Sequence, residues 1–205
     1  MRWLMIWLLG LAPAWAEGER AGDFDYYVMA LSWSPNFCAT TTRENPQCDA
    51  PFGWVLHGLW PQYEEGWPSY CPTNHRNPSR RDTADMADIM GSPGSAWHQW
   101  NKHGRCTGLS SEDYYALSRE AYGRITRPEV FRKMSKSFTM PASLIEEAFL
   151  RDNPAFEADM LTVTCKDRRI QEVRVCMRRS LEPRICGRDV IRDCTMQNAL
   201  MDPIE

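Results

Sequence analysis

The sequence predicts an α+β fold, in which a central antiparallel sheet packs against several helices and is cross-linked by disulfides. Three observations favour this class. Segments rich in β-forming residues lie near both ends of the chain, patterns typical of helices lie between them, and eight cysteines are spread over positions 38–194. Strands at both ends with helices between them are typical of α+β domains.

The expected strands are apolar or alternating segments that end at turn signals. Residues 24–34 and 54–60 are rich in β-formers, and each run is closed by a proline, Pro35 or Pro61. Towards the C-terminus apolar and polar residues alternate. This alternation predicts a strand over residues 170–178 and, after a turn, a short strand over residues 184–186.

Between these strands the pattern indicates loops and helices. Residues 62–95 are rich in glycine and proline, which predicts a long connection with one short helix over residues 83–90. Ser110 and the acidic residues after it form a helix start signal, and the helix is expected to continue to Tyr122. Two further helices are expected to begin near Thr126 and Met140.

The first residues resemble an export signal. Residues 1–16 carry an arginine near the start, an apolar middle and the small residues Ala14 and Ala16, so we expect cleavage after Ala16. The apolar run is too short for a membrane span. The mature chain, 17–205, is then a single domain that is secreted or periplasmic and makes no contact with a membrane.

The eight cysteines are interpreted as disulfides, because their number is even and an export signal precedes them. No C-x-x-C spacing is present, which removes the usual zinc and redox motifs. Short loops cost least to close, so the pairs Cys38–Cys48 and Cys176–Cys186 are favoured. The residues alone leave the other pairings open.

The charge excludes binding of nucleic acid by bulk attraction, because the formal net charge is −3. A local basic site could still act on a polyanion. Basic residues cluster at 166–169 and 174–184, but we interpret them as the solvated face of a strand and assign them no role.

Residues 97–106 are the strongest candidate for chemistry, since they hold two of the four histidines together with a lysine and two tryptophans. In a helix, His98, Lys102, Gln99 and His103 fall at roughly 0°, 40°, 100° and 140° around the axis. That face, with two imidazoles, an amide and an ammonium, suits a phosphate. Trp97, Trp100 and Gly104 then face the core, where Trp54 is also expected.

Two motifs in this chain resemble those of a known family. The segments His57-Gly-Leu-Trp-Pro61 and His98-Gln-Trp-Asn-Lys-His-Gly-Arg-Cys106 are similar to the active-site segments of the ribonuclease T2 family, secreted acid endoribonucleases related to plant S-ribonucleases. Leu31-Ser-Trp-Ser-Pro-Asn-Phe-Cys38 resembles the first strand of that family. The order of the helices and the late cysteines are also similar, so the resemblance covers essentially the whole mature chain.

The resemblance implies metal-free cleavage of single-stranded RNA, without a cofactor, through a 2′,3′-cyclic phosphate. By position, His103 matches the general base and His57 the general acid, while His98 and Lys102 match the residues that hold the phosphate. DNA lacks the 2′-hydroxyl nucleophile and is expected to be spared. The family pattern also implies the disulfides Cys71–Cys106, Cys38–Cys48, Cys165–Cys194 and Cys176–Cys186.

One position departs from the family pattern. Gln99 stands where the family usually has a catalytic glutamate, and an amide can donate a hydrogen bond to phosphate but cannot ionise. We therefore expect activity with a shifted pH profile. The alternative is a weakened or inactive member that serves as an RNA-binding or defence module.

Base recognition is expected in the residues that follow the first motif. Trp60 and Trp67 could stack on a base or pack in the core, and the two readings are evenly balanced. Tyr70 could stack as well, and Gln62 could read a base edge. Base preference stays open, and a monomer is expected.

Other functions fit the residues less well. A zinc hydrolase would need two histidines one helical turn apart, and His98 and His103 are five residues apart. A cysteine nucleophile conflicts with the even number of cysteines. His75, in a polar loop, is interpreted as a surface group.

Overall fold

The structure of the chain is a computed structural model that describes residues 19–205. The expected export signal, residues 1–16, lies outside the described residues. Within 19–205, every helix is too short or too polar to cross a membrane.

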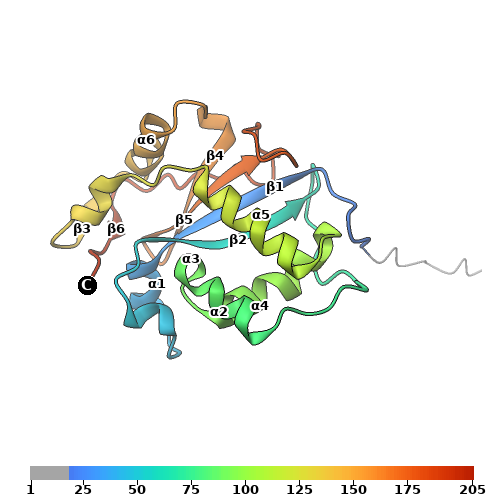
Figure 1. Cartoon of the computed structure of the whole chain (residues 1–205). Helices are drawn as coiled ribbons and strands as arrows, with labels where there is room; N and C mark the ends of the chain where they lie inside the picture. The colour runs from blue at the N-terminus through green and yellow to red at the C-terminus, as the bar shows by residue number, and fades with distance from the viewer. Residues whose placement is uncertain (1–18) are drawn as a thin grey trace, which may run out of the picture.

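A six-stranded sheet forms the centre of the molecule (Figure 1). Its strands are β1 (Tyr26–Trp33), β2 (Trp54–Gln62), β3 (Phe138–Met140), β4 (Leu161–Lys166), β5 (Arg169–Met177) and β6 (Ala199–Met201). They are arranged in the order β2-β1-β5-β6-β3, and β4 pairs with β5. All pairs are antiparallel except β5 with β6. The predicted α+β class with an antiparallel central sheet is therefore confirmed.

Six α-helices surround this sheet: α1 (Ser34–Thr40), α2 (Arg80–Asp85), α3 (Ala87–Met90), α4 (Pro93–Lys102), α5 (Ser111–Gly123) and α6 (Ser143–Asp152). Short 3₁₀ turns cover Pro46–Asp49, Gly104–Thr107, Glu129–Lys133 and Ala158–Met160. Helices α3, α4 and α5 pack along β2, and α6 packs beside β4 (Figure 1). The core between the layers includes the fully buried Trp33, Trp100 and Tyr114.

The positions of Pro61 and Pro35, which were predicted to close the first two strands, differ in the structure. Pro61 does not end β2 but pairs with Tyr27 inside it. Because β2 pairs only with β1, it is an edge strand, where the missing amide hydrogen of a proline breaks no ladder bond. Pro35 is the second residue of α1, which begins directly after β1, and its fixed φ is compatible with the first turn of a helix.

The helices differ from expectation mainly in length. Ser110 caps α5 through the backbone N–H of Asp113, as its sequence signal indicated. The expected helix over 83–90 is divided at Met86 into α2 and α3. The helix expected near Thr126 is only the 3₁₀ turn Glu129–Lys133, and Met140 ends β3 rather than opening α6. Residues 184–186 form no strand, and only Pro183 bridges to Met177.

Four disulfides cross-link these elements, and they are the pairs that the family resemblance implied: Cys38–Cys48, Cys71–Cys106, Cys165–Cys194 and Cys176–Cys186. Cys71 follows β2 and Cys106 follows α4. Their bond therefore ties together the two segments that carry the candidate histidines.

Candidate active site

All eight residues proposed for catalysis and substrate binding line one cavity of about 270 Å³. The cavity lies between β2, the end of α4 and β5. The residues are His57, Trp60, Gln62, Trp67, His98, Gln99, Lys102 and His103. Segments about 40 residues apart in the chain thus converge, as the resemblance required.

His57 is placed by an irregularity in β2. Ala30 of β1 pairs with Gly58 and Leu31 pairs with Leu56, so His57 is the extra residue of a β-bulge. A bulge bends its strand and redirects the local side chains. The His57 side chain is 43% exposed, whereas Leu56 is fully buried. The bulge therefore turns an imidazole towards solvent within a strand that otherwise faces the core.

Glu172 of β5 holds His57 from the opposite side. Its Oε1 lies 2.5 Å from His57 Nδ1, and the carboxylate can only accept this hydrogen bond. Glu172 is buried, and Arg174 donates to its Oε2 at 2.8 Å. Burial raises the pKa of Glu172, but the hydrogen bond from His57 and the charges of His57 and Arg174 outweigh it and hold the pKa below its usual range.

Helix α4 presents the second motif differently from expectation. Gln99 and Trp100 are buried, His98 is exposed, and His103 is the buried residue that follows the last turn. Trp97 was expected in the core, but it is 43% exposed. The helix begins at Pro93 and buries Ala96, Gln99 and Trp100, which occupy one stripe of a 3.6-residue period, and Trp97 lies outside that stripe.

Trp60 lies between the two imidazoles. Its ring stacks on His103 with centroids 5.3 Å apart, and it meets His57 edge-on at 5.2 Å. The indole N–H donates to Gln99 Oε1 at 2.7 Å. A Cβ at Gly58 would collide with both Gln99 Oε1 and the indole nitrogen, so glycine leaves the space for this bond. The Gln99 oxygen thus positions Trp60, and only the amide nitrogen is left for a phosphate.

Both histidines of the second motif have a lowered pKa. Burial, followed by the positive charges of Lys102, His57 and His98, lowers the pKa of His103 to about 3. Burial also lowers the pKa of His98, assisted by the charges of Lys102 and His57. The Nδ1 atom of His103 is buried and has no hydrogen-bond partner within residues 19–205. His103 is therefore available as a proton acceptor over most of the pH range.

The rim of the cavity carries aromatic side chains, and a loop near the C-terminus holds that rim in place. Trp67 is 54% exposed, whereas Gln62 is buried and its amide donates to the carbonyl of Pro61. The Asp189 carboxylate accepts a hydrogen bond from the backbone N–H of Gly66 at 2.7 Å, which fixes the loop that precedes Trp67.

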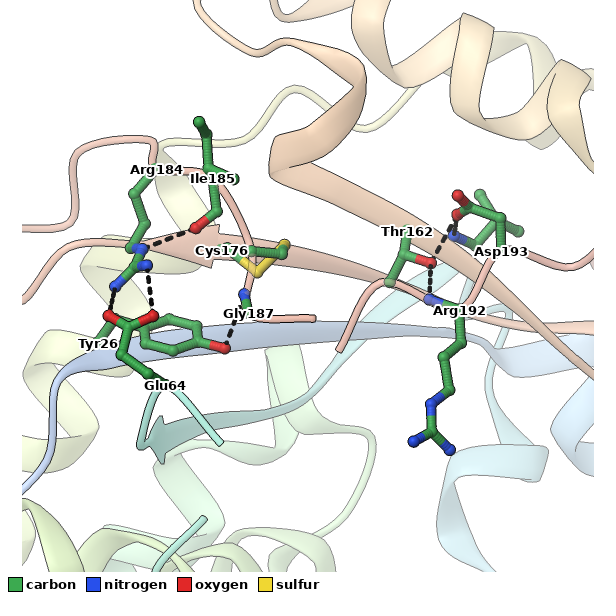
Figure 2. Close-up of a disulfide and its surroundings, with 11 residues drawn as sticks. Tyr26, Glu64, Thr162, Cys176, Arg184, Ile185, Gly187, Arg192 and Asp193 are labelled. Carbon is green, nitrogen blue, oxygen red and sulfur yellow. Dashed lines mark hydrogen bonds and ion pairs between the residues drawn. A yellow bond between two sulfur atoms is a disulfide. The ribbon is translucent and has the colours of Figure 1, made fainter. Parts of the chain in front are cut away.

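A second contact holds the same loop. Figure 2 shows the Arg184 guanidinium in a bidentate ion pair with the Glu64 carboxylate. In the same view, the Tyr26 hydroxyl accepts a hydrogen bond from the backbone N–H of Gly187. The Cys176–Cys186 disulfide fixes this C-terminal segment to β5. Trp67 is therefore presented to the cavity by a fixed loop.

Sequence reasoning missed Glu172, Arg174 and Asp189, all of which line the cavity. It had assigned Arg174 to a solvated strand face with no role. Instead, the Arg174 guanidinium pairs with Glu172 and lies 5.4 Å from the Trp60 ring centroid. The sequence did hold one signal for the first two residues. Glu172 and Arg174 are two positions apart in a predicted strand, so their side chains lie on the same face of it. His75 is exposed, as expected, and Tyr70 is exposed as well.

Comparison with solved structures identifies proteins that share this fold. Among solved structures, an RNase-related protein from Calystegia sepium has a TM-score of 0.66 at 18% identity and covers 88% of this chain and 97% of its own. RNase NT, solved in complex with 5′-AMP, has a TM-score of 0.63 at 18% identity and covers 86% and 97%. These likenesses concern the fold.

The sequence comparisons name the family. The model of the Ribonuclease T2 family matches residues 24–194, and the chain therefore belongs to that family. A ribonuclease of Aeromonas hydrophila is 44% identical over 117 residues, which is 54% of this chain and 53% of that protein. A probable ribonuclease of Haemophilus influenzae is 33% identical over 138 residues, or 58% and 49%. The matches thus span about half the length of these curated relatives.

The Gln99→Glu variant tests the electrostatics of the site. A carboxylate still accepts the Trp60 N–H, but it adds a negative charge to the cavity that favours protonated imidazole. We predict that the pKa of His103 rises above its value of about 3. NMR titration of the ring protons measures the change, with Gln197→Glu on the exposed surface as the control. An unaltered His103 titration would show that Gln99 is not coupled to this histidine.

Proposed function

We propose that this chain is an exported endoribonuclease, secreted or periplasmic, that cleaves single-stranded RNA through a 2′,3′-cyclic phosphate without a metal ion. The observation that carries the proposal is that buried His103 and carboxylate-bonded His57 line one cavity together with Lys102. The similarity to proteins named ribonucleases supports RNA as the substrate. We expect the enzyme to act as a monomer and to leave DNA intact.

The two histidines divide the proton transfers. His103 accepts the proton of the 2′-hydroxyl, and the freed oxygen attacks the neighbouring phosphorus. The bond from phosphorus to the 5′-oxygen breaks, and His57 gives its proton to that oxygen. Water then opens the cyclic phosphate with the two roles exchanged.

Surrounding groups prepare the histidines for these roles. Glu172 accepts the Nδ1 proton of His57, which leaves Nε2 to face the leaving group. A bound phosphate adds negative charge, which raises the pKa of His103 and makes it a stronger base. The Lys102 ammonium balances the negative charge on the non-bridging oxygens, and the His98 ring and the Gln99 amide nitrogen can each donate a hydrogen bond to one of them.

The second candidate is a weakened or inactive family member that binds RNA or acts in defence. Gln99 favours it, because an amide cannot ionise as the glutamate usual at this position in the family can. Both imidazoles are nevertheless in place. Within residues 19–205, no three His, Cys, Asp or Glu side chains are grouped as they would be around a metal ion.

Digestion of a defined single-stranded RNA with EDTA across pH tests the proposal. We expect products with 2′,3′-cyclic phosphate ends, later opened to 3′-phosphates. A 2′-deoxy substitution at the cleaved position should block the reaction. His57→Ala and His103→Ala should each lower kcat/KM roughly 10²–10⁴-fold, because each removes one proton transfer. His75→Ala, on the exposed surface, is the matched control and should leave the rate unchanged.

Two results would overturn the assignment. RNA left intact at every pH would favour the inactive binding module. Activity that EDTA abolishes, or products with 5′-phosphate ends, would require a different mechanism.

The Glu172→Gln variant tests the positioning of His57. An amide cannot restore the charged contact with Arg174, and its nitrogen would oppose the His57 N–H. We expect kcat to fall roughly tenfold to hundredfold with KM near the wild-type value, because Glu172 acts through His57 and does not touch RNA. Glu172→Asp should recover part of the rate, and exposed Glu182→Gln is the control. A purely structural role would instead lower the thermal stability and leave kcat of the folded fraction unchanged.

A further inference from the structure

A second cavity, of about 170 Å³, opens beside His57. It shares His57, Gln171 and Glu172 with the larger cavity, but neither His103 nor Lys102 lines it. Its lining includes instead Lys166 and Arg169 from the turn between β4 and β5. His57 therefore faces more than one cavity, and the proposed general base, His103, lines the larger cavity of the active site but not this second one.

The turn itself has an unusual backbone. Lys166 pairs with Arg169, and the two residues between them, Asp167 and Arg168, have φ values of 49° and 62°. Two-residue hairpin turns of this kind prefer glycine or asparagine, because other side chains are strained at positive φ. Strain of this kind is often retained at functional sites. Residues 166–169 were predicted to lie on a solvated strand face. Lys166 and Arg169 do lie in strands β4 and β5 and residues 166–168 are exposed, but Asp167 and Arg168 form the turn between the strands.

The charged side chains of this turn differ in whether they are already ion-paired. Arg169 forms an ion pair with Asp202. Lys166 is exposed and makes no ion pair within residues 19–205. Asp167 offsets one charge, but three cations against the carboxylates of Asp167 and Asp202 leave the turn positive. The Lys166 ammonium is the cation best placed to meet an anion that enters the second cavity.

The proposed roles of the histidines give the direction of the RNA strand. This step rests on the proposed function. If His57 protonates the departing 5′-oxygen, the strand downstream of the cleaved bond leaves on the side of His57, away from His103. That strand carries a phosphate at each nucleotide. We propose that Lys166 is part of an additional phosphate-binding site that contacts the RNA strand 3′ of the cleaved bond.

Two substrates that differ by one phosphate test this site. One is a dinucleoside monophosphate, and the other is the same dinucleotide with a 3′-terminal phosphate. We expect the wild-type enzyme to favour the phosphorylated form several-fold in kcat/KM. Lys166→Ala should remove this preference and leave cleavage of the unphosphorylated form unchanged. Lys166→Arg should retain the preference, because a guanidinium also binds phosphate.

Lys133→Ala is the matched control, because Lys133 is an exposed lysine in the 3₁₀ turn Glu129–Lys133 and does not line the second cavity. It should keep the preference of the wild type. On polymeric RNA, Lys166→Ala should also reduce the slope of log KM against log salt concentration by about 0.7, as expected for the loss of one phosphate contact on a single strand.

The possible outcomes separate the two proposals. A wild-type enzyme that cleaves both substrates equally, or a Lys166→Ala variant that keeps the preference, overturns the additional site and leaves the ribonuclease function intact. Equal losses on both substrates would also overturn it. A wild-type protein that cleaves neither substrate overturns the proposed function, and the additional site with it.

Discussion

The contact of Trp60 with both imidazoles is the interaction on which the site depends. The indole stacks on His103, meets the edge of His57 and is fixed by its N–H bond to Gln99. It therefore sets the relation between a residue of β2 and a residue that follows α4. The close approach of these elements requires the absence of a side chain at Gly58. The fold around the site can be understood as support for this contact.

That support comes from several directions. Tyr114 of α5 donates its hydroxyl to the carbonyl of Leu59, which anchors β2 beside Trp60. The Cys71–Cys106 disulfide closes the segment after β2 onto the end of α4. These restraints are covalent or buried, so the geometry does not depend on a bound ligand. A preorganised arrangement of this kind lowers the cost of aligning groups around a developing charge.

The same cavity places the two histidines in opposite environments. Burial and neighbouring positive charges keep His103 neutral, whereas His57 is exposed and bonded to the carboxylate of Glu172. Two imidazoles in such different surroundings are suited to different proton-transfer roles. The lowered pKa of His103 also affects folding: protons bind the unfolded chain below about pH 6.5 but reach folded His103 only near pH 3, so its contribution to stability declines as pH falls through that range.

The sequence and the structure differ in an informative way. Helical spacing predicted that His98, Gln99, Lys102 and His103 share one face. All four line the cavity, although His103 follows the end of α4 and only the other three lie in the helix. Trp97 was misplaced, because the face of α4 that is buried is set by its packing against α2, α3 and β2, which helical spacing alone does not give. Glu172 could not be placed from sequence, because its contact with His57 depends on the strand order β2-β1-β5. Strand pairing brings together segments that are far apart in the chain, and the sequence of a strand does not show which strand it will pair with.

The central claim is that His57 and His103 act on opposite sides of one phosphate. A crystal structure with a non-cleavable dinucleotide that lacks the 2′-hydroxyl tests it most directly. The account predicts that the phosphorus lies between the two imidazoles, with the Lys102 ammonium on a non-bridging oxygen. A phosphate that contacts only one of the two rings, or that binds outside the cavity, would contradict it.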